Sequence, residues 1–354
     1  MKKIVFTGGG SAGHVTPNIA IINELKKEKD WEISYIGSKA GIEKDLIANI
    51  SIPYYSISSG KLRRYLSKEN IKDIFKVLKG CYDARKVLKK IKPNVVFSKG
   101  GFVSVPVVIA ASLLKIPVVL HESDLTPGLA NKIAVRFATK IFTSFEETVR
   151  YLPSDKAKAI GSPIRRDILE GSAVEGRRYL GFSNDKPILT IMGGSLGAKK
   201  INEIIRKNLD HLLQTYQIVH LCGKGNVSTE HEGIAGYKQF EYVYDELSDI
   251  LAATDYVITR GGSNSIFEFL ALHIPMLIIP LTKQQSRGDQ ILNGKVFSEN
   301  GYAYMIEEED LTSDHLLETL KRMEQNSQRF ITTMKNSQAN SALKEIITEL
   351  ERYN

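Results

Sequence analysis

Six polar side chains that could carry acid–base chemistry follow short apolar runs in the first half of the sequence. They are His14, Ser98, Lys99, His121, Glu122 and Asp124. Parallel strands open at one edge of their sheet, so residues that follow successive strands are expected to line one cleft. His14 comes directly after a glycine-rich turn, and an imidazole that titrates near neutral pH suits a general base. The alternative is an ordinary exposed histidine at the start of a helix.

A second group of polar residues lies within a βαβ pattern that spans residues 256–280. The pattern consists of a β-branched run, a Gly-Gly-Ser turn, a helix of about two turns and a second apolar run. The polar residues at the start of the helix are Ser263, Asn264 and Ser265. Backbone N–H groups and the helix dipole attract phosphate there, and Glu268 follows within reach of a ribose. The pattern predicts a nucleotide site, although Gly and Ser are also common in ordinary βα turns.

The strand–glycine turn–helix pattern occurs a second time in the sequence. One copy begins with a strand at 3–7 and continues through a helix at 18–29 to a strand at 31–36. The other copy begins at 187–192, after a segment at 161–167 whose proline and charged residues are typical of an interdomain linker. The two copies predict two domains of the same kind.

We therefore expect an α/β protein of the GT-B type, with two Rossmann-like parallel-sheet domains facing a cleft. The predicted boundaries are an N-terminal domain over 1–163, a C-terminal domain over 164–336 and a last segment, 337–354, whose helix could cross back. A dinucleotide dehydrogenase would carry an acidic residue at the end of the second strand. This sequence has Ile36-Gly37-Ser38 there, which argues against NAD.

Composition limits the class of protein further. The 354 residues carry a net charge of +8, and the two cysteines, Cys81 and Cys222, have no metal-ligand spacing. A reducing, cytoplasmic setting is the simplest fit. The sequence contains no signal-peptide pattern and no apolar run of the ~20 residues that span a bilayer, so we expect any membrane association to be peripheral.

Most of the positive charge lies in residues 61–92. This segment holds twelve Lys or Arg against three acids, and its apolar residues recur at helical spacing. Those residues are Ile71, Ile74, Phe75, Leu78 and Tyr82, continued by Val87, Leu88 and Ile91. One interpretation is a helix packed on its own domain with a solvated basic face, and another is a surface that meets anionic lipid. Nucleic acid is disfavoured because the segment has few aromatics and no recognisable reading motif.

Several motifs together resemble the MurG family of GT-B glycosyltransferases, within glycosyltransferase family 28. They are residues 7–17, the turn at 100–104, His121-Glu122, the turn at 193–198 and the stretch 260–290, and the resemblance covers essentially the whole chain. It implies an inverting transfer of N-acetylglucosamine from UDP-N-acetylglucosamine to the 4-hydroxyl of lipid I, which gives lipid II for peptidoglycan. It also implies a peripheral enzyme at the cytoplasmic face of the cell membrane, without a cofactor. No Asp-x-Asp pair follows a strand, so we expect no metal requirement.

The same resemblance implies roles for individual residues. Ser195 would contact the pyrophosphate, Tyr244 would lie beside the uracil, and Glu268 would hold the ribose. Gln290 would meet the sugar, and Arg165 matches a linker arginine associated with donor binding. The first glycine turn would approach both substrates through Ser11, Ala12 and Gly13, with His14 as the base. Asp124 departs from the family pattern, because a number of relatives carry Asn there and an ionised carboxylate only accepts hydrogen bonds.

Two other kinds of protein remain compatible with the sequence. One is a related enzyme of the same fold, either a transferase acting on another lipid or a UDP-sugar 2-epimerase. The basic segment 61–92 argues against the epimerase, which needs no lipid acceptor. The other is a non-catalytic nucleotide-binding module, which would bind UDP without turnover.

Overall fold

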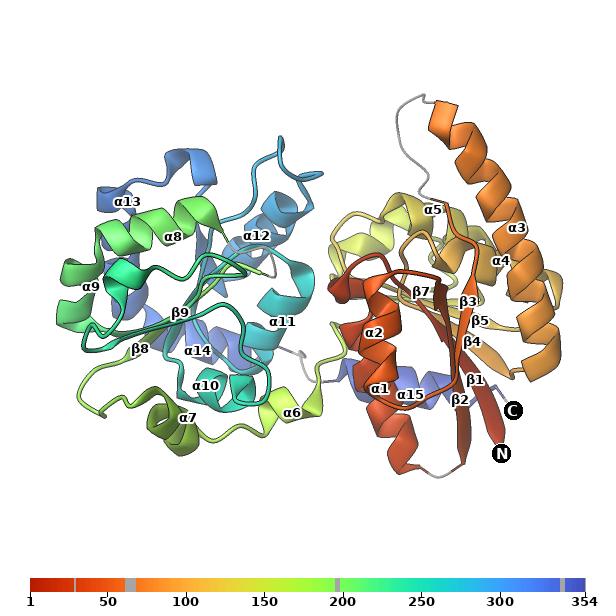
Figure 1. Ribbon diagram of the computed structural model, residues 1–354, viewed down its shortest axis with the longest axis horizontal. Coiled ribbons are helices and arrows are strands. Elements are labelled where there is room, and N and C mark those ends of the chain that lie inside the picture. Colours follow the sequence, from red (N-terminus) through yellow and green to blue (C-terminus); the bar gives the residue numbers. More distant parts are fainter. Residues whose placement is uncertain (29, 61–67, 195–197, 338–340, 354) are drawn as a thin grey trace. The chain divides into compact units, whose positions relative to one another are not determined.

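The chain folds into two α/β units, each built on its own sheet. The computed structural model describes residues 1–28, 30–60, 68–194, 198–337 and 341–353, and it describes no side chain between 61 and 72. Unit 1 comprises Met1–Arg165 and Asn340–Asn354, and unit 2 comprises Arg166–Ala339. Each unit contains one parallel sheet with helices on both faces (Figure 1). The predicted fold of two Rossmann-like parallel-sheet domains is therefore confirmed.

Seven parallel strands form the sheet of unit 1, in the order β3-β2-β1-β4-β5-β6-β7. They are β1 (Lys2–Thr7), β2 (Trp31–Ser38), β3 (Tyr54–Ile57), β4 (Val95–Ser98), β5 (Val118–Glu122), β6 (Lys140–Thr143) and β7 (Ala157–Ala159). The central strands β1, β4 and β5 are rich in Val, Ile and Phe; β4 and β5 are buried throughout, and β1 is buried from its third residue on. Such runs suit a parallel sheet that helices cover on both sides.

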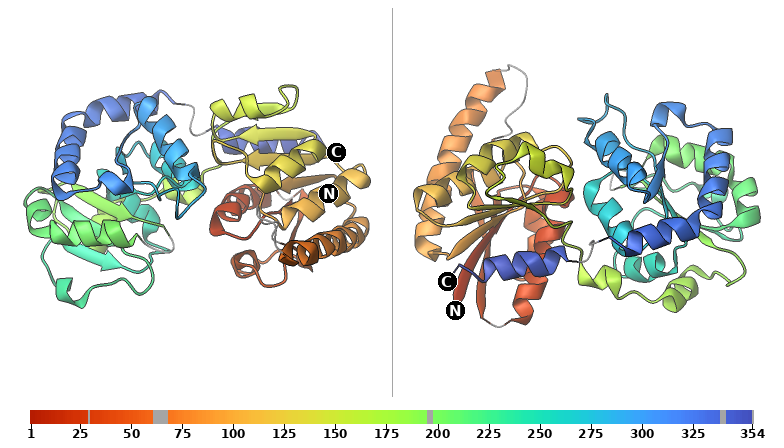
Figure 2. Two further views of the ribbon diagram at one scale, coloured as in Figure 1. Left: turned by 90° about the horizontal axis from the view of Figure 1, so that it is seen from above. Right: turned by 180° about the vertical axis from the view of Figure 1, so that it is seen from behind.

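Helices cover the two faces of this sheet with separate apolar clusters. On one face lie α1 (Thr16–Lys27), α2 (Ile42–Ala48) and α15 (Ala342–Leu350). On the other lie α3 (Lys68–Ile91), α4 (Ser104–Leu113) and α5 (Leu129–Ala134). The C-terminal helix α15 packs beside α1 (Figure 2), where Ala342, Ile346 and Leu350 join the core of unit 1.

Six parallel strands form the sheet of unit 2, in the order β10-β9-β8-β11-β12-β13. They are β8 (Ile188–Met192), β9 (Gln217–Leu221), β10 (Tyr237–Phe240), β11 (Tyr256–Thr259), β12 (Met276–Ile278) and β13 (Ala303–Met305). The helices are α6 (Arg166–Leu169), α7 (Ala173–Leu180), α8 (Lys199–Lys207), α9 (Leu209–Thr215), α10 (Leu247–Ala253), α11 (Ser263–Ala271), α12 (Asp289–Glu299), α13 (Ser313–Gln325) and α14 (Ser327–Lys335). Within the part of the chain that is described, no helix is long and apolar enough to cross a membrane.

Each sheet reverses its strand order at one point. In unit 1 the reversal lies between β1 and β4, and in unit 2 between β8 and β11. Loops that leave the carboxyl ends of two such strands diverge, and open α/β sheets bind their ligands in the crevice between them. The four glycine turns predicted from the sequence follow these four strands. The topology therefore predicts one ligand-binding edge in each unit, at the carboxyl ends of the two strands where the order reverses.

Candidate active site

A hydrogen bond to the end of a neighbouring strand holds His14. The residue closes a short 3₁₀ turn, Ala12–His14, between β1 and α1, and it is half-buried. Its Nδ1 lies 3.2 Å from the carbonyl oxygen of Lys99, which follows β4. A carbonyl only accepts, so Nδ1 carries the proton and Nε2 is the basic nitrogen of the neutral ring. The fold thus presets the tautomer that a general base needs.

Two glycine turns pack against each other beside His14. The Gly9 N–H donates to the Gly100 carbonyl over 3.3 Å. Gly101 has a positive φ of 85°, and a side chain there would collide with the Gly9 carbonyl. Ser11 is exposed on this edge, and Ala12 and Gly13 beside it are half-buried. The structure therefore brings the predicted residues 11–14 together with the turn after β4.

Glu43 anchors the first glycine turn from within, and the sequence analysis did not identify it. The carboxylate is fully buried and accepts hydrogen bonds from Gly10 N–H at 3.2 Å, Ser38 N–H at 3.0 Å and Ser38 Oγ at 2.5 Å. Burial raises the pKa of Glu43, but these hydrogen bonds outweigh burial and hold the pKa below its ordinary value. The only sequence signal was a carboxylate in the first turn of α2.

Lys99 and His121 form a buried pair behind His14. The Lys99 side chain is 1% exposed, and its Nζ lies 2.7 Å from His121 Nδ1 and also donates to Ser123 Oγ. His121 Nε2 lies 2.9 Å from the carbonyl oxygen of Gly161. Burial lowers the pKa of Lys99 to about 8, which Glu122 and Asp124 partly offset. Burial and the Lys99 charge hold the pKa of His121 well below its usual range.

Glu122 organises the loop that follows β5. Its carboxylate accepts hydrogen bonds from Asp124 N–H at 3.0 Å, Gly128 N–H at 3.1 Å and Asn131 Nδ2 at 2.8 Å. Burial, followed by the Asp124 charge, raises the pKa of Glu122 above its ordinary value. Asp124 itself is half-buried on this loop.

The expectation that all six polar residues line one cleft is therefore wrong. Four of them are buried, namely Ser98, Lys99, His121 and Glu122. Ser98 Oγ accepts from Gly100 N–H at 3.3 Å, so it also fixes a turn. His14 and Asp124 are the two that reach the surface partly. The spacing predicted the common edge correctly, but it could not distinguish side chains that face solvent from those that support the edge.

The predicted phosphate site of unit 2 is a helix start without a side-chain cap. Gly262 is the N-cap of α11, no side chain caps the helix, and its first turn contains no acidic residue. Ser263 is buried in the first turn, and Asn264 and Ser265 beside it are half-buried. Glu268 is half-buried in the second turn. Because the backbone N–H groups of a first turn have no partner within the helix, this start can accept an anion.

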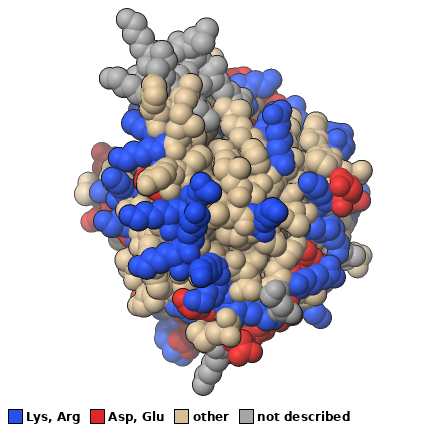
Figure 3. All heavy atoms as spheres, turned by 90° about the vertical axis from the view of Figure 1, so that its right-hand side faces the viewer, with Lys and Arg blue, Asp and Glu red and all other residues tan. Residues whose placement is uncertain are grey.

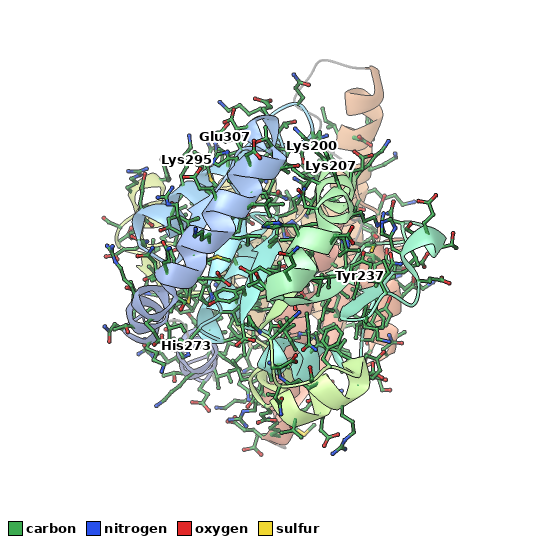
Figure 4. All side chains as sticks on the ribbon, turned by 90° about the vertical axis from the view of Figure 1, so that its left-hand side faces the viewer. Lys200, Lys207, Tyr237, His273, Lys295 and Glu307 are labelled. Carbon is green, nitrogen blue, oxygen red and sulfur yellow. The ribbon has the colours of Figure 1, made fainter. Side chains whose placement is uncertain are left out.

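A buried ion pair between Arg260 and Glu308 lies next to the start of α11. Both are buried and form an ion pair, and Arg260 Nη1 also donates to the Ile279 carbonyl at 3.0 Å. The Glu308 carbonyl accepts from Lys200 at the start of α8. The neighbouring Glu307 pairs instead with Lys295 at 3.7 Å on the surface (Figure 4). Glu308 thus connects the start of α8 with Arg260, the residue that follows β11, a role the sequence did not indicate.

The other residues predicted to bind the sugar donor lie at separate places in the chain. Gln290 is in the first turn of α12, where its Oε1 accepts from Leu281 N–H at 3.0 Å and its backbone packs against Gly261. Tyr244 is 80% exposed in the loop after β10, with its ring centroid 6.2 Å from that of Tyr242. Arg165 is half-buried at the end of unit 1. Ser195 lies outside the described residues.

Among the described residues, no group of three or more His, Cys, Asp or Glu side chains could hold a metal ion. Lys99 in unit 1 and Arg260 in unit 2 are buried cationic side chains that directly follow β4 and β11.

Comparisons with known proteins cover almost the whole chain. Residues 4–143 match the glycosyltransferase family 28 N-terminal domain, and residues 188–350 match its C-terminal domain. The chain is 58% identical over 352 residues to the UDP-N-acetylglucosamine--N-acetylmuramyl-(pentapeptide) pyrophosphoryl-undecaprenol N-acetylglucosamine transferase of Shouchella clausii, with 99% of each chain covered. It is 52% identical to the protein of the same name from Clostridium botulinum, covering 100% of this chain and 99% of the relative.

Solved structures agree on the fold. Acinetobacter baumannii MurG superposes with a TM-score of 0.78 at 24% identity, over 99% of this chain and 100% of that one. A UDP-GlcNAc 2-epimerase from Neisseria meningitidis gives 0.68 at 14% identity over the whole of both chains. These likenesses extend to enzymes with different names, so they establish the GT-B fold alone. On the sequence matches, the resemblance seen in the motifs is confirmed, and the chain belongs to glycosyltransferase family 28.

Proposed function

We propose that the chain transfers N-acetylglucosamine from UDP-N-acetylglucosamine to the 4-hydroxyl of the muramoyl sugar of lipid I, forming lipid II. The names of relatives that are 52–58% identical over nearly the full length support this reaction. The observation that carries the mechanism is the hydrogen bond from His14 Nδ1 to the Lys99 carbonyl, which leaves Nε2 as the base.

The transfer needs one proton acceptor on the side of the attacking hydroxyl. His14 Nε2 takes the proton of the 4-hydroxyl as its oxygen bonds to the anomeric carbon, and the bond to the UDP phosphate breaks with its electron pair. A single displacement of this kind inverts the anomeric carbon. Ser11, Ala12 and Gly13 lie beside His14 on this edge and would approach both the acceptor and the donor.

Unit 2 would hold the donor and stabilise the departing UDP. The start of α11 offers backbone N–H groups to the pyrophosphate through Ser263, Asn264 and Ser265. Glu268 would accept from the ribose hydroxyls. Preorganised N–H donors of this kind can stabilise the negative charge that develops on the leaving phosphate without a metal ion.

The base and sugar of the donor would meet residues outside α11. Tyr244 is exposed enough to stack on the uracil. The Gln290 side chain already accepts from Leu281 N–H, so its amide nitrogen remains the donor for a sugar hydroxyl. Arg165 would add positive charge near the donor. Ser195 lies outside the described residues. Its proposed contact with the pyrophosphate rests on the family motif.

We further propose that α3 docks this enzyme on the cytoplasmic face of the membrane. Four apolar side chains on one face of α3 are exposed: Ile74 (51%), Phe75 (68%), Leu78 (61%) and Tyr82 (72%). The opposite face packs on the sheet through Ala84, Leu88 and Ile91. Exposed basic residues accompany the apolar face: Lys76, Lys79, Arg85, Lys86, Lys89 and Lys90. Figure 3 shows blue Lys and Arg side chains among uncharged residues on this side of unit 1.

The two interpretations of the basic segment are therefore compatible with each other. One side of α3 belongs to the core, and the other combines apolar area with positive charge, which suits an anionic lipid surface. The predicted member of this set at Ile71 lies outside the described side chains. A lipid-linked acceptor gives such a surface a use that a UDP-sugar epimerase does not have.

The reaction is tested by following UDP release with and without a lipid I analogue. We expect release that depends on the acceptor and falls by about 10²- to 10⁴-fold in His14→Gln at saturating substrates. The exposed His211→Gln serves as the matched control and should keep wild-type turnover. Acceptor-independent consumption of the donor would favour an epimerase or hydrolase, and UDP binding without turnover would favour a binding module.

Membrane docking is tested with the double variant Phe75→Ser/Leu78→Ser and vesicles of anionic or neutral lipid. Each apolar side chain contributes about 1.5 to 3 kcal/mol when fully buried, so sedimentation with anionic vesicles should fall at least tenfold. Val174→Ser, an exposed apolar residue of unit 2, is the control. Wild-type binding that is equal on both lipids and insensitive to salt would contradict the electrostatic part of the proposal.

A further inference from the structure

We propose that Lys99 is a positioning residue for the transfer, acting through His14 from a fully buried site. The inference rests on the proposed role of His14 as the base. Lys99 connects the two strands at the reversal point of the sheet in unit 1, since its own N–H donates to the Thr7 carbonyl at 3.0 Å. The same residue therefore holds the end of β1 and, through its carbonyl, the imidazole that follows β1.

The hydrogen bonds around Lys99 indicate which ring nitrogen carries the proton in His121 and in His14. His121 Nε2 faces the carbonyl of Gly161, which only accepts, so Nε2 is protonated and Nδ1 holds the lone pair. That lone pair accepts from the Lys99 ammonium at 2.7 Å. The Lys99 carbonyl then accepts from His14 Nδ1. Backbone carbonyls thus set both tautomers. The Lys99 side chain, held by His121 and Ser123, acts by anchoring the residue whose carbonyl binds His14.

Burying an ammonium group costs free energy unless hydrogen bonds and nearby opposite charges compensate, and this site provides both. A charge inside a protein must be hydrogen-bonded, and Lys99 donates to His121 and Ser123. The charged groups that face it are Glu122 and Asp124, and both favour the ammonium form. With a pKa of about 8, Lys99 remains mainly protonated at neutral pH despite its burial. An apolar side chain could fill the same space, but it could not donate to His121 and Ser123, so it would not anchor the residue whose carbonyl holds His14.

The test is a double-mutant cycle between Lys99→Met and His14→Ala in the full-length chain. Lys99→Met should lower kcat by roughly 10- to 100-fold, because the base is misplaced rather than removed. UDP affinity should stay unchanged, since unit 2 holds the donor. If Lys99 acts through His14, Lys99→Met should cost almost nothing further in the His14→Ala background. Lys158→Met, an exposed lysine on β7, is the matched control.

The possible outcomes distinguish the positioning role of Lys99 from the base role of His14. Equal losses from Lys99→Met in both backgrounds, or wild-type turnover of Lys99→Met, would overturn the positioning role and leave the base role intact. Wild-type turnover of His14→Ala would overturn both. If Lys99→Met does not fold, nitrogen-15 NMR of histidine-labelled wild-type protein decides instead. We expect the Nδ1–H tautomer for His14 and the Nε2–H tautomer for His121, and the opposite assignment at either residue would contradict the proposal.

Discussion

Replacing Glu43 by Gln tests how the first glycine turn is held. Oε1 of Glu43 accepts from two donors of Ser38, and Oε2 accepts from Gly10 N–H. Glutamine keeps one oxygen, so at best the Ser38 contacts survive while an NH₂ group faces the N–H of Gly10. A hydrogen bond to a charged group contributes about 1.5 to 3 kcal/mol, and a buried donor left unsatisfied costs a similar amount. We expect Glu43→Gln to lower the stability of unit 1 by about 2 to 3 kcal/mol at pH 7.

The effect should depend on pH with a definite sign. The pKa of Glu43 lies below its ordinary value in the folded protein, so the carboxylate stabilises the fold above the unfolded-state pKa. That contribution disappears as pH falls through the lowered native pKa. The difference between wild type and Glu43→Gln should therefore be largest near neutral pH and shrink as pH falls through the lowered native pKa of Glu43.

The assay uses the single tryptophan of the chain. Trp31 is buried on β2, the strand that ends at Ser38, so its fluorescence during urea unfolding reports unit 1. Glu32→Gln is the control, because its ion pair with Lys3 is exposed and should contribute less than about 1 kcal/mol. A loss below about 0.5 kcal/mol for Glu43→Gln, or a loss independent of pH, would refute the reasoning.

Three further predictions concern unit 2 and the leaving group. Glu268→Ala should weaken UDP binding by about 1 to 3 kcal/mol in calorimetry, and unchanged affinity of the folded variant would reject the ribose contact. Glu308→Gln should cost about 3 to 5 kcal/mol of stability by circular dichroism, because it leaves the buried Arg260 without its carboxylate. Glu307→Gln, which breaks an exposed pair with Lys295, should cost less than about 1 kcal/mol. Activity should persist in excess EDTA, and a loss restored only by Mg²⁺ or Mn²⁺ would show that a metal is needed.

Features that depend on neighbouring residues could be predicted from the sequence. Short apolar runs followed by glycine turns are local signals, and the predicted strand at 187–192 appears as β8 over Ile188–Met192. The predicted helix at 18–29 appears as α1 over Thr16–Lys27, shifted by two residues because Pro17 sits in its first turn. Since strands in a parallel sheet end at one edge, the grouping of His14 with Lys99 followed from order alone.

Features that depend on distant contacts could not be predicted. Glu43 lies 33 residues from the Gly10 N–H that it binds, and nothing in its own helix distinguishes it from a surface glutamate. Lys99 occupies a position where a surface side chain is also possible, and only the packing of β1, β4 and β5 shows that it is buried. In the same way, helical spacing placed Phe75 and Leu88 on one apolar side, whereas the structure exposes one and buries the other.

The anomeric configuration of the product tests the central claim most directly. Incubation of the chain with UDP-N-acetylglucosamine and a lipid I analogue, followed by NMR of the isolated product, reports both the transfer and its stereochemistry. The account predicts one added N-acetylglucosamine on the 4-hydroxyl, inverted at the anomeric carbon by a single displacement with His14 as the base. Retention of configuration, or an unmodified acceptor after the donor has been consumed, would contradict it.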